Sequence, residues 1–353
     1  MRRAIASLVL VTCSSTVLLA QDPAAAKELS AEGVRLHDEG TYEEAVKKFD
    51  AALKKDKNNF YAMAEKANTL EAMGRYEECI AMADQAILLH GANEEVSMLY
   101  LAKANALDKL KRPEEALAVY KRGQEVSPTE HQLWYNEGVT LAGMGRTGEA
   151  KASFEHAMRL APGHASSHNA LGRLEQKDKH RIPALMALSR CLILEPEGQR
   201  ARGNLSLVKE LMKGSAEKTG ANTVTVTIDP ALLPAKGDTA HNKEDDFTSA
   251  ELIIDMMSAL DLSEENKSKQ FVELFQEKFD SVCAVMDETK AGQYGFFWEY
   301  YAPYFVALKK AGHLEAAVMV MHRSSAATGV QNWLMTNKEA VTAFEEWTAA
   351  YAW

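Results

Sequence analysis

The sequence has few cysteines and no block of basic residues. Four cysteines occur in 353 residues. Cys13 falls in the N-terminal apolar segment, which leaves Cys79, Cys191 and Cys283 widely spaced. An odd, scattered set of this kind does not form a disulfide framework. The formal net charge is −10, whereas nucleic-acid-binding proteins usually present a basic face. These absences exclude a disulfide scaffold and argue against nucleic acid as a partner.

The sequence also lacks the common signatures of catalytic and metal centres. It contains no Gly-x-Ser-x-Gly elbow, no His-Glu-x-x-His motif, no phosphate-binding loop and no Cys-x-x-Cys pair. His241 lies among Asp238, Glu244, Asp245 and Asp246, but the spacing of a calcium loop and a second histidine or cysteine for zinc are both missing. We therefore interpret this stretch as a solvated acidic linker, and expect no catalytic residue, no cofactor and no metal ion.

The N-terminal segment has the three parts of a secretory signal peptide. Arg2 and Arg3 form a basic start, an apolar stretch follows, and small residues precede a cleavage point after Ala20. The segment is too short and too mixed for a membrane anchor. Cys13 raises the alternative of a lipoprotein, but Thr12 is bulky for the position before a lipidated cysteine, so cleavage after Ala20 is favoured. We expect a periplasmic or secreted protein with no membrane span.

The next part of the sequence repeats itself with a period of 34 residues. Shifting the sequence by this amount superimposes Gly40–Ala45 on Gly74–Cys79, and Arg112–Ala116 follows in a later register. A period in the thirties is typical of an array of helical hairpins. Glu94–Val96 interrupts the period. The repeat defines five units, at 26–59, 60–93, 97–130, 131–164 and 165–198.

Small residues recur at fixed positions of the units, where two antiparallel helices must approach each other closely. The eighth position is glycine or alanine in every unit, and large residues such as Phe49 and Phe154 fill the spaces between the small ones. Cys79 and Cys191 fall at small positions of this pattern, so we expect them to be small buried apolar residues. The residues at the eighth position are Gly33, Ala67, Ala104, Gly138 and Gly172.

With this pattern, residues 26–198 resemble the tetratricopeptide repeat (TPR) family. The departures are local: Lys111 and Lys179 replace the turn glycine, and Glu175 replaces an apolar residue. The resemblance implies an all-α fold, a right-handed superhelix or α-solenoid in which the first helix of each unit lines a concave groove. Residues 199–213 are expected to form a helix that covers the end of the fifth unit, which completes an array over 21–213.

The resemblance also implies which side chains face the groove. Asparagine amides can pair with the main chain of any extended peptide, and tyrosine adds flat contact area. The carboxylate clamp of chaperone-binding members needs cations at positions that hold Ser30, Val34, Met98 and Ala102 here, so we expect no receptor for a chaperone tail. The predicted partner-binding residues are Tyr61, Asn68, Leu101, Asn105, Tyr135, Asn136, Asn169 and Arg173.

A linker over 214–247 and a second helical domain over 248–353 follow the array. Alternation over Thr223–Ile228 predicts a strand, which either pairs with part of the C-terminal domain, the favoured reading, or offers an edge to a partner. Thr248 is expected to cap the first helix of that domain, and Phe247 is expected to pack on Leu252 as a hydrophobic staple. The expected apolar face of this helix is Leu252, Ile253, Met256, Met257 and Leu260.

The rest of the C-terminal domain is read as helical and partly TPR-like. A longer helix is expected to start at Ser263, and the aromatic run Phe296–Phe305 to form a helix that is kinked or broken at Pro303. We interpret this run as core rather than as a docking patch. Residues 298–331, which begin within this run, match a degraded sixth repeat. Trp333–Trp353 is expected to form an amphipathic helix that closes the domain.

The sequence therefore predicts a protein-interaction scaffold or assembly factor of the bacterial periplasm or outer envelope, which binds an extended peptide segment in a concave groove and is not an enzyme. The alternative is an enzyme or a small-molecule site in 248–353, presented by the repeats. His322 is a conceivable general base there, although a surface or capping role is favoured. The sequence does not indicate which protein is the partner, or the oligomeric state.

Overall fold

A computed structural model describes most of the chain. The predicted signal peptide 1–20 and its cleavage site at Ala20 lie outside or at the edge of the described residues, and His241 lies outside them. The described part contains seventeen α-helices and one two-stranded sheet. It divides into two compact units, an N-terminal unit that ends at Val126 and a C-terminal unit that starts at Ser127. The described residues are 21–91, 94–220, 223–232 and 243–353.

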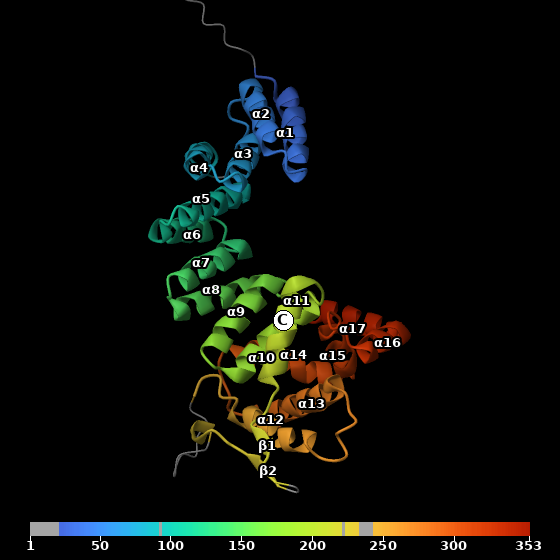
Figure 1. Ribbon diagram of the computed structural model, residues 1–353. Helices are drawn as coiled ribbons and strands as arrows, with labels where there is room; N and C mark the ends of the chain where they lie inside the picture. Colours follow the sequence, from blue (N-terminus) through green and yellow to red (C-terminus); the bar gives the residue numbers. More distant parts are fainter. Residues whose placement is uncertain (1–20, 92–93, 221–222, 233–242) are drawn as a thin grey trace, which may run out of the picture. The chain divides into compact units, whose positions relative to one another are not determined.

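The N-terminal unit consists of three helical hairpins (Figure 1). Each hairpin joins two antiparallel helices through a short turn, and a 3-10 turn, η1 at Glu94–Val96, stands where the sequence period is interrupted. The helices are α1 (Pro23–Asp38), α2 (Tyr42–Lys55), α3 (Phe60–Ala72), α4 (Tyr76–His90), α5 (Ser97–Lys109) and α6 (Pro113–Val126).

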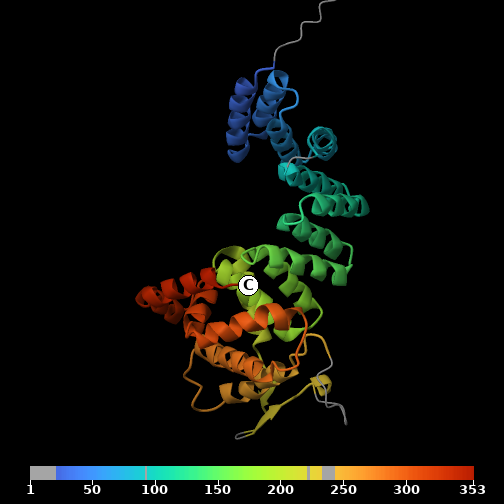
Figure 2. The same ribbon diagram turned by 180° about the vertical axis from the view of Figure 1, so that it is seen from behind.

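The C-terminal unit begins with two further hairpins and one additional helix. These are α7 (His131–Gly143), α8 (Thr147–Leu160), α9 (Ala165–Lys177), α10 (Arg181–Leu194) and α11 (Gly198–Leu211). Its remaining helices are η2 (Pro230–Leu232), α12 (Thr248–Asp261), α13 (Phe271–Thr289), α14 (Phe296–Lys310), α15 (Leu314–Met321), α16 (Thr328–Thr336) and α17 (Lys338–Ala350). From behind, α14 crosses α10, and both α14 and α15 pack on α10 (Figure 2).

Glycine at the eighth position of a repeat lets the two helices of a hairpin meet. A Cβ atom added at Gly33 or at Gly138 would lie 2.6 Å from the ring of Phe49 or of Phe154. At Gly172 it would lie 2.8 Å from the Leu188 side chain. These distances are too short for carbon atoms in contact. The small residue and the large residue of the repeat are therefore two halves of one packing contact.

The turns of the hairpins share a left-handed residue, whether or not it is glycine. Gly40, Gly74 and Gly145 have φ of 75°, 75° and 77°. Lys111 and Lys179 take the same place with φ of 62° and 65°. This conformation costs a residue with a Cβ roughly 1–2 kcal/mol. The lysine departures thus preserve the turn at a local cost in stability.

Glu175 is buried in the array although it replaces an apolar residue. Its side chain is 5% exposed and contacts His180 Nδ1 at 2.6 Å and Lys151 Nζ at 3.0 Å. Lys151 also contacts Asp178 Oδ2 at 2.7 Å. A buried carboxylate is tolerated where it is paired and hydrogen-bonded, and these partners supply both conditions.

The cysteines of the repeats are small buried residues, as the pattern predicts. Cys79 is fully buried, Cys191 is 1% exposed, and both are free thiols, as is Cys283. Burial raises the pKa of the Cys79 thiol to about 12 and that of Cys191 to about 11. Reactive cysteines need a stabilised thiolate, so these thiols are held in their unreactive form.

The strand of the linker pairs within the linker itself. β2 (Val224–Val226) forms an antiparallel hairpin with β1 (Ala216–Lys218), in which Glu217 stands opposite Thr225. The hairpin packs on α12. The sequence indicated the strand, but its pairing partner is β1, which precedes it by a few residues and carries no apolar alternation.

Helix α12 buries a different face from the predicted one. Met256 and Leu260, both expected in the core, are 60% and 55% exposed. The buried residues are instead Ala250, Ile254 and the two polar residues Asp255 and Ser258. The apolar periodicity of this helix therefore gave the wrong face.

Hydrogen bonds to the hairpin explain why the polar face of α12 is buried. Asp255 Oδ1 accepts from Arg181 Nη1 at 3.0 Å and from the Ser215 amide at 3.3 Å. Ser258 Oγ accepts from the Ala216 amide at 3.2 Å. A buried polar group that is satisfied in this way costs little, and the contact comes from chain segments whose position the sequence pattern did not reveal.

The start of α12 also differs from the prediction. The N-cap position is Phe247 and not Thr248, and the preceding Asp246 accepts from the Thr248 amide through its Oδ1 at 3.0 Å. Phe247 stacks on Trp298 with ring centroids 4.4 Å apart. The neighbouring Asp245 is half-buried and its Oδ1 accepts from the amides of Phe297 at 2.9 Å and Trp298 at 3.2 Å. The interpretation of these residues as a solvated linker is wrong at Asp245, which caps α14.

Other helix boundaries in the C-terminal region also differ from the prediction. The helix expected from Ser263 begins at Phe271, where Gln270 and Glu273 form a reciprocal capping box. Helix α14 runs unbroken through Pro303. The predicted closing helix is two helices, α16 and α17, which meet at Asn337.

The aromatic run on α14 is core, as predicted. Tyr301, Tyr304 and Phe305 are fully buried. Tyr301 Oη lies 2.6 Å from His168 Nδ1 on α9, and Arg190 on α10 donates to Tyr304 Oη at 3.0 Å. The run therefore fastens the helices of the C-terminal region to the last repeats.

Candidate peptide-binding face

The predicted residues of the N-terminal unit lie on α3 and α5 among carboxylates. Tyr61 is 45% exposed and Asn68 is exposed, whereas Leu101 is half-buried. Burial raises the pKa of Tyr61, and the negative charges of Glu65 and Asp38 raise it further. Carboxylates around a tyrosine oppose its ionisation. The surface around these predicted binding residues of the N-terminal unit is therefore electronegative.

Asn105, the fourth predicted residue of this unit, already has partners within the protein. The hydroxyl of Tyr120 donates to Asn105 Oδ1 at 2.7 Å, and the Asn105 side chain also hydrogen-bonds the Glu71 carboxylate. Tyr120 is 1% exposed. Since a buried hydroxyl needs a partner, Asn105 supports the packing of α5 on α6 and is less available to a ligand than the prediction assumed.

The predicted residues on α7 in the C-terminal unit are half-buried. The ring of Tyr135 lies edge-on to His164, with centroids 4.8 Å apart, and 5.8 Å from Phe154. Asn136 makes no side-chain hydrogen bond within the described residues. Its amide is thus available to a main chain that lies along α7.

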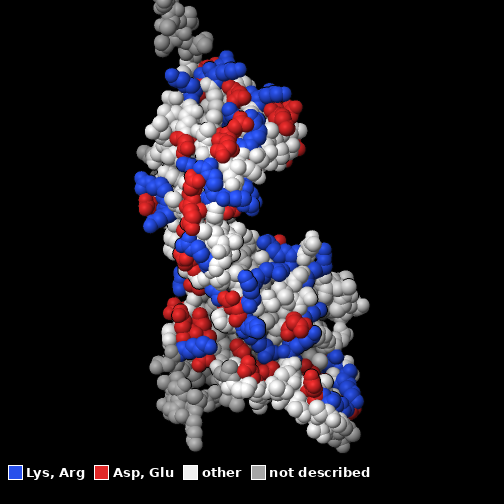
Figure 3. All heavy atoms as spheres, turned by 60° about the vertical axis from the view of Figure 1, so that its left-hand side comes forward, with Lys and Arg blue, Asp and Glu red and all other residues white. Residues whose placement is uncertain are grey.

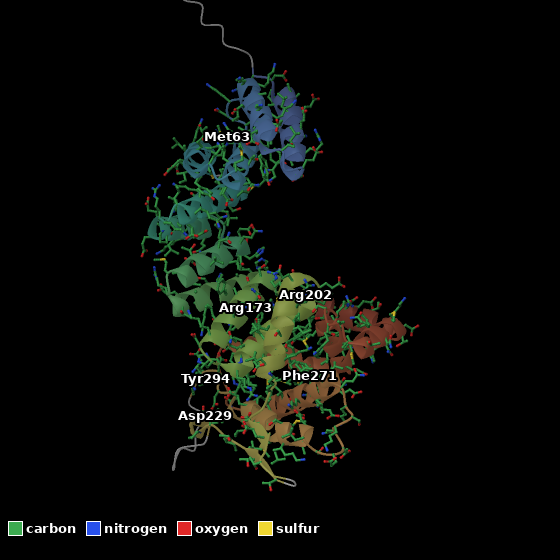
Figure 4. The ribbon with its side chains drawn as sticks, in the orientation of Figure 1. Met63, Arg173, Arg202, Asp229, Phe271 and Tyr294 are labelled. Carbon is green, nitrogen blue, oxygen red and sulfur yellow. The ribbon has the colours of Figure 1, made fainter. Side chains whose placement is uncertain are left out.

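The remaining two predicted residues, Asn169 and Arg173, lie in an open cleft between α9 and α11. The cleft has a volume of about 800 Å³. Arg173 Nη2 donates to Asn204 Oδ1 at 3.0 Å, and its Nε approaches Asn169 Oδ1 at 3.4 Å. Figure 4 shows Arg173 on α9 beside Arg202 on α11. The cleft is lined by Asn169, Arg173, Gln199, Arg200, Arg202 and Gly203.

The cleft is electropositive, in contrast to the net charge of the chain. Its lining contains three arginines and no carboxylate. Arg200 contacts the Glu195 carboxylate and donates to Ser166 Oγ at 2.9 Å, so its charge is partly compensated. Within the described residues, neither Arg173 nor Arg202 forms an ion pair. Lys and Arg side chains gather over part of the C-terminal unit in Figure 3.

Two histidine rings lie near the positive charge of Arg200. The rings of His131 and His164 lie 4.9 Å apart at the start of α7 and α9. Burial lowers the pKa of His164, and the positive charges of His131 and Arg200 lower it further. A group next to cations gains a proton less readily, which is consistent with an anion-attracting surface.

Sequence reasoning missed the residues that α11 contributes to this cleft. Gln199, Arg200, Arg202 and Gly203 were placed on a helix that only covers the end of the array. One signal was available: α11 occupies the place of the first helix of a next repeat, and first helices line the groove in the family. The repeat pattern is too weak beyond residue 198 to have indicated this.

The C-terminal residue considered as a general base is enclosed. His322 is 1% exposed, its Nδ1 lies 2.8 Å from the Val318 carbonyl oxygen, and its ring packs edge-on to Phe275. Burial lowers its pKa to about 4. His322 is thus a neutral buried side chain at the C-cap of α15, which agrees with the predicted capping role and not with a surface position.

The described residues contain neither a cluster of metal ligands nor a helix that could span a membrane. No group of three or more histidine, cysteine, aspartate or glutamate side chains is placed to hold a metal ion. None of the helices that the structure describes combines the length and the apolar character needed to cross a bilayer.

The five hairpins define the class of the protein as a helical-repeat solenoid. Family models described as tetratricopeptide repeat match residues 36–103, 99–130 and 131–164. Residues 36–164 thus match the tetratricopeptide repeat family, within a described fold that is all-α apart from one two-stranded sheet. Proteins of this family act as protein-interaction scaffolds.

Two curated relatives share part of the repeat region. The Protein STIP1 homolog of Dictyostelium discoideum is 33% identical over 108 residues, 31% of this chain and 19% of the relative. The Peroxisomal targeting signal receptor of Yarrowia lipolytica is 31% identical over 137 residues, 38% of this chain and 22% of the relative. The chain thus spans about a fifth of the length of these relatives.

Solved structures resemble the repeat region at low identity. Pseudomonas aeruginosa PilF is 22% identical, with a TM-score of 0.47, over 53% of this chain and 82% of that chain. A thermophilic TPR protein of Thermus thermophilus is 21% identical, with a TM-score of 0.45, over 53% of this chain and 99% of that chain.

Proposed function

We propose that this protein is a scaffold or assembly factor of the bacterial periplasm or outer envelope, and that it holds an extended segment of another polypeptide against the first helices of its repeats. The observation that carries the proposal is the open cleft between α9 and α11, because two of the predicted residues, Asn169 and Arg173, line it. The unpaired amide of Asn136 on α7 supports it within the same unit. One curated relative is named as the receptor of a targeting signal, which agrees with peptide recognition by such repeats.

A main chain lying along α7, α9 and α11 would meet different contacts in order. The ring of Tyr135 offers apolar area, the Asn136 and Asn169 amides offer a donor and an acceptor each, and the arginines follow at α11. Asparagine can serve both the N–H and the C=O of a peptide unit. The face is therefore suited to a backbone in extended conformation rather than to one compact small molecule.

Site-specific photo-crosslinking tests the binding face. A photo-reactive amino acid is placed at Tyr135 or Asn169 in full-length protein produced in a bacterial envelope, and at Ala152, an exposed residue of the second helix α8, as a control. We expect discrete crosslinked partners at Tyr135 and Asn169 and none at Ala152. Equal crosslinking at all three positions would contradict the proposal, and so would a crosslink at Ala152 alone.

A reporter fusion tests the proposed location. Residues 1–25 are joined to alkaline phosphatase without its own leader, and the N-terminus of the exported product is sequenced. We expect phosphatase activity outside the cytoplasm and a product that begins at Gln21, unchanged by Cys13→Ser. An inactive cytoplasmic fusion would overturn the export proposal, and a lipidated product lost in Cys13→Ser would replace it with membrane anchoring.

A further inference from the structure

The cleft between α9 and α11 differs from the rest of the binding face in its charge. Three guanidinium groups converge on it, two of them without a carboxylate partner in the described part of the chain. Unpaired positive charge on the surface of a chain with a net charge of −10 is a local exception. Such an exception points to a ligand of opposite charge.

We propose that this cleft is an anion subsite that receives the carboxylate side chains of an acidic stretch in the bound polypeptide. The proposal rests on the proposed function, since it names the chemical class of the segment that the repeats hold. The subsite would contact side chains through Arg173 and Arg202, while Asn136 and Asn169 contact the main chain.

Arg173 is held in place before a ligand arrives. Its Nη2 is anchored at 3.0 Å to Asn204, a fully buried residue, and its Nε faces Asn169. These partners are neutral amides, so they orient the guanidinium without cancelling its charge. A guanidinium that is already ordered loses less conformational entropy when it binds a carboxylate in the bidentate manner.

The start of α11 brings amide groups to the cleft, although the Glu197 carboxylate at its N-cap offsets their partial positive charge. Glu197, at the N-cap position, makes no side-chain cap, and Gln199 and Arg200 in the first turn line the cleft. The uncapped amides at a helix N-terminus carry partial positive charge. Gly203, one turn further, also lines the cleft, and an added Cβ there would lie in ordinary contact with Arg173 Nη2 at 3.5 Å.

The size and setting of the cleft favour a peptide over a nucleic acid. A volume of about 800 Å³ accommodates a few side chains and no long polyanion. Glu195 stands at its edge in contact with Arg200, and the rest of the chain is acidic. A phosphodiester chain that extended beyond the cleft would be repelled, whereas a short acidic stretch within a neutral peptide would not.

Fluorescence anisotropy with full-length mature protein tests the inference. The probes are a labelled extended peptide with a central Glu-Glu-Asp, the same peptide with Gln-Gln-Asn, and an oligothymidine of similar length. At 50 mM salt we expect the acidic peptide to bind at least about tenfold more tightly than the neutral one. The preference should shrink at 200 mM salt, because screening weakens charge pairs at an exposed site.

Substitutions of the cleft arginines test whether the cleft causes the preference for the acidic peptide. Arg173→Gln with Arg202→Gln should remove the preference for the acidic peptide and leave binding of the neutral peptide within about twofold. The control pair, Arg122→Gln with Lys267→Gln, changes the net charge equally at exposed positions outside the cleft and should leave the preference intact. Because Arg173 contacts a buried residue, Arg202→Glu alone serves as a second variant, since the exposed Arg202 side chain has no hydrogen-bond partner in the described residues.

The outcomes separate this inference from the proposed function. Equal binding of the acidic and neutral peptides, or an equal loss in the control pair, would overturn the subsite and leave peptide binding standing. Tighter binding of the oligothymidine than of either peptide would replace it with a nucleic-acid site. Absence of all peptide binding together with absence of crosslinks at Tyr135 and Asn169 would overturn the proposed function itself.

Discussion

The two units of the protein differ in the charges around their candidate binding residues. In the N-terminal unit, Asn68 hydrogen-bonds Glu65, and Tyr61 lies near Glu65 and Asp38. In the C-terminal unit, Asn169 contacts Arg173 in a cleft without carboxylates. Both sets occupy the positions that face the groove in the same repeat family. The difference shows that a repeat fixes where a side chain points, while the residue chosen at that place fixes which partner is attracted.

The units also differ in whether their candidate binding residues already have hydrogen-bond partners within the protein. Asn105 in the N-terminal unit accepts from Tyr120 and hydrogen-bonds Glu71. Asn136 in the C-terminal unit has no such partner in the described residues. Asparagines predicted to face the groove can therefore serve the protein's own packing in one unit and remain available in the other.

Reversing the charges of the cleft arginines should change peptide binding more than any other substitution and would test the difference between the units most directly. Arg173→Glu with Arg202→Glu should weaken binding of the acidic peptide about 100-fold, equivalent to about 2.7 kcal/mol, because two attractive contacts become repulsive. Glu65→Lys with Asp38→Lys in the N-terminal unit should change it by less than about threefold. Titration calorimetry measures both. An equal loss in the two pairs would show that the units do not differ in their role.

Closing the space between paired helices should destabilise both units. Gly33→Ala and Gly138→Ala each place a Cβ 2.6 Å from a phenylalanine ring, and overpacking of this kind costs about 1–3 kcal/mol. Gly143→Ala is the matched control, because an added Cβ there meets nothing within 4 Å. Urea unfolding gives the free energies. A neutral Gly138→Ala would mean that the hairpin adjusts and that glycine is not required at this position.

The two asparagines should separate stability from binding. Asn105→Ala removes a partner of the buried Tyr120 hydroxyl and should lower the free energy of unfolding by about 1–3 kcal/mol. Asn136→Ala should change it by less than about 0.5 kcal/mol and should weaken peptide binding. Urea unfolding and anisotropy on the same samples distinguish the two effects. If Asn136→Ala were the more destabilising, the assignment of roles would be reversed.

The C-terminal unit should also carry a pH dependence that arises away from the cleft. Burial raises the pKa of Glu155 to about 7, and the charges of Asp245 and Glu175 raise it further. The folded state then keeps a proton that the unfolded state loses above its ordinary pKa near 4.5. This group therefore stabilises the folded state less and less as the pH rises from about 4.5 to about 7.

Replacement by glutamine isolates that group. Glu155→Gln should be more stable than the original protein at pH 8, by on the order of 1–2 kcal/mol after allowance for solvent screening, and equally stable at about pH 4, below the unfolded-state pKa. The comparison of the two proteins cancels other titrating groups, such as His168, whose pKa burial lowers to about 3. Thermal unfolding at both pH values measures the difference. A gap of the same size at about pH 4 would assign the effect to packing and not to ionisation.

The smallest effect is expected at the turns. Lys111→Gly in the N-terminal unit and Lys179→Gly in the C-terminal unit relieve a left-handed lysine and should each stabilise the protein by about 0.5–1 kcal/mol, since the gain is partly offset by the greater freedom of glycine in the unfolded chain. Lys177→Gly, in the last turn of α9, is the control and should destabilise. Equal destabilisation by all three changes would show that the lysine turns are not strained.

The sequence prediction was most accurate within the repeat units. Helices α3, α5, α7 and α9 begin at Phe60, Ser97, His131 and Ala165, the residues at which the predicted units start. Five copies in phase average out local departures, so even the lysine turns and the buried Glu175 do not disturb the frame. The 34-residue period was therefore a more reliable signal than any single helix pattern.

Outside the repeats, a single helix pattern was not sufficient. Helix α12 shows its apolar residues Met256 and Leu260 to solvent, because its polar face receives hydrogen bonds from a hairpin and from Arg181. Asp245 was read as solvated, yet it caps α14 from a distance of about fifty residues along the chain. Such contacts depend on which segments meet, and apolar spacing within one segment carries no information on that.

The sequence by itself determined the helical hairpins. The spacing of small and large residues permits one close packing of each helix pair, and this spacing recurs in all five units. Only the tertiary structure decided the cleft, because Arg173 and Arg202 lie on helices separated by α10 and become neighbours when α11 packs beside α9. The physical reason is that helix periodicity encodes which face is buried locally, whereas the convergence of like charges from two helices is set by long-range packing.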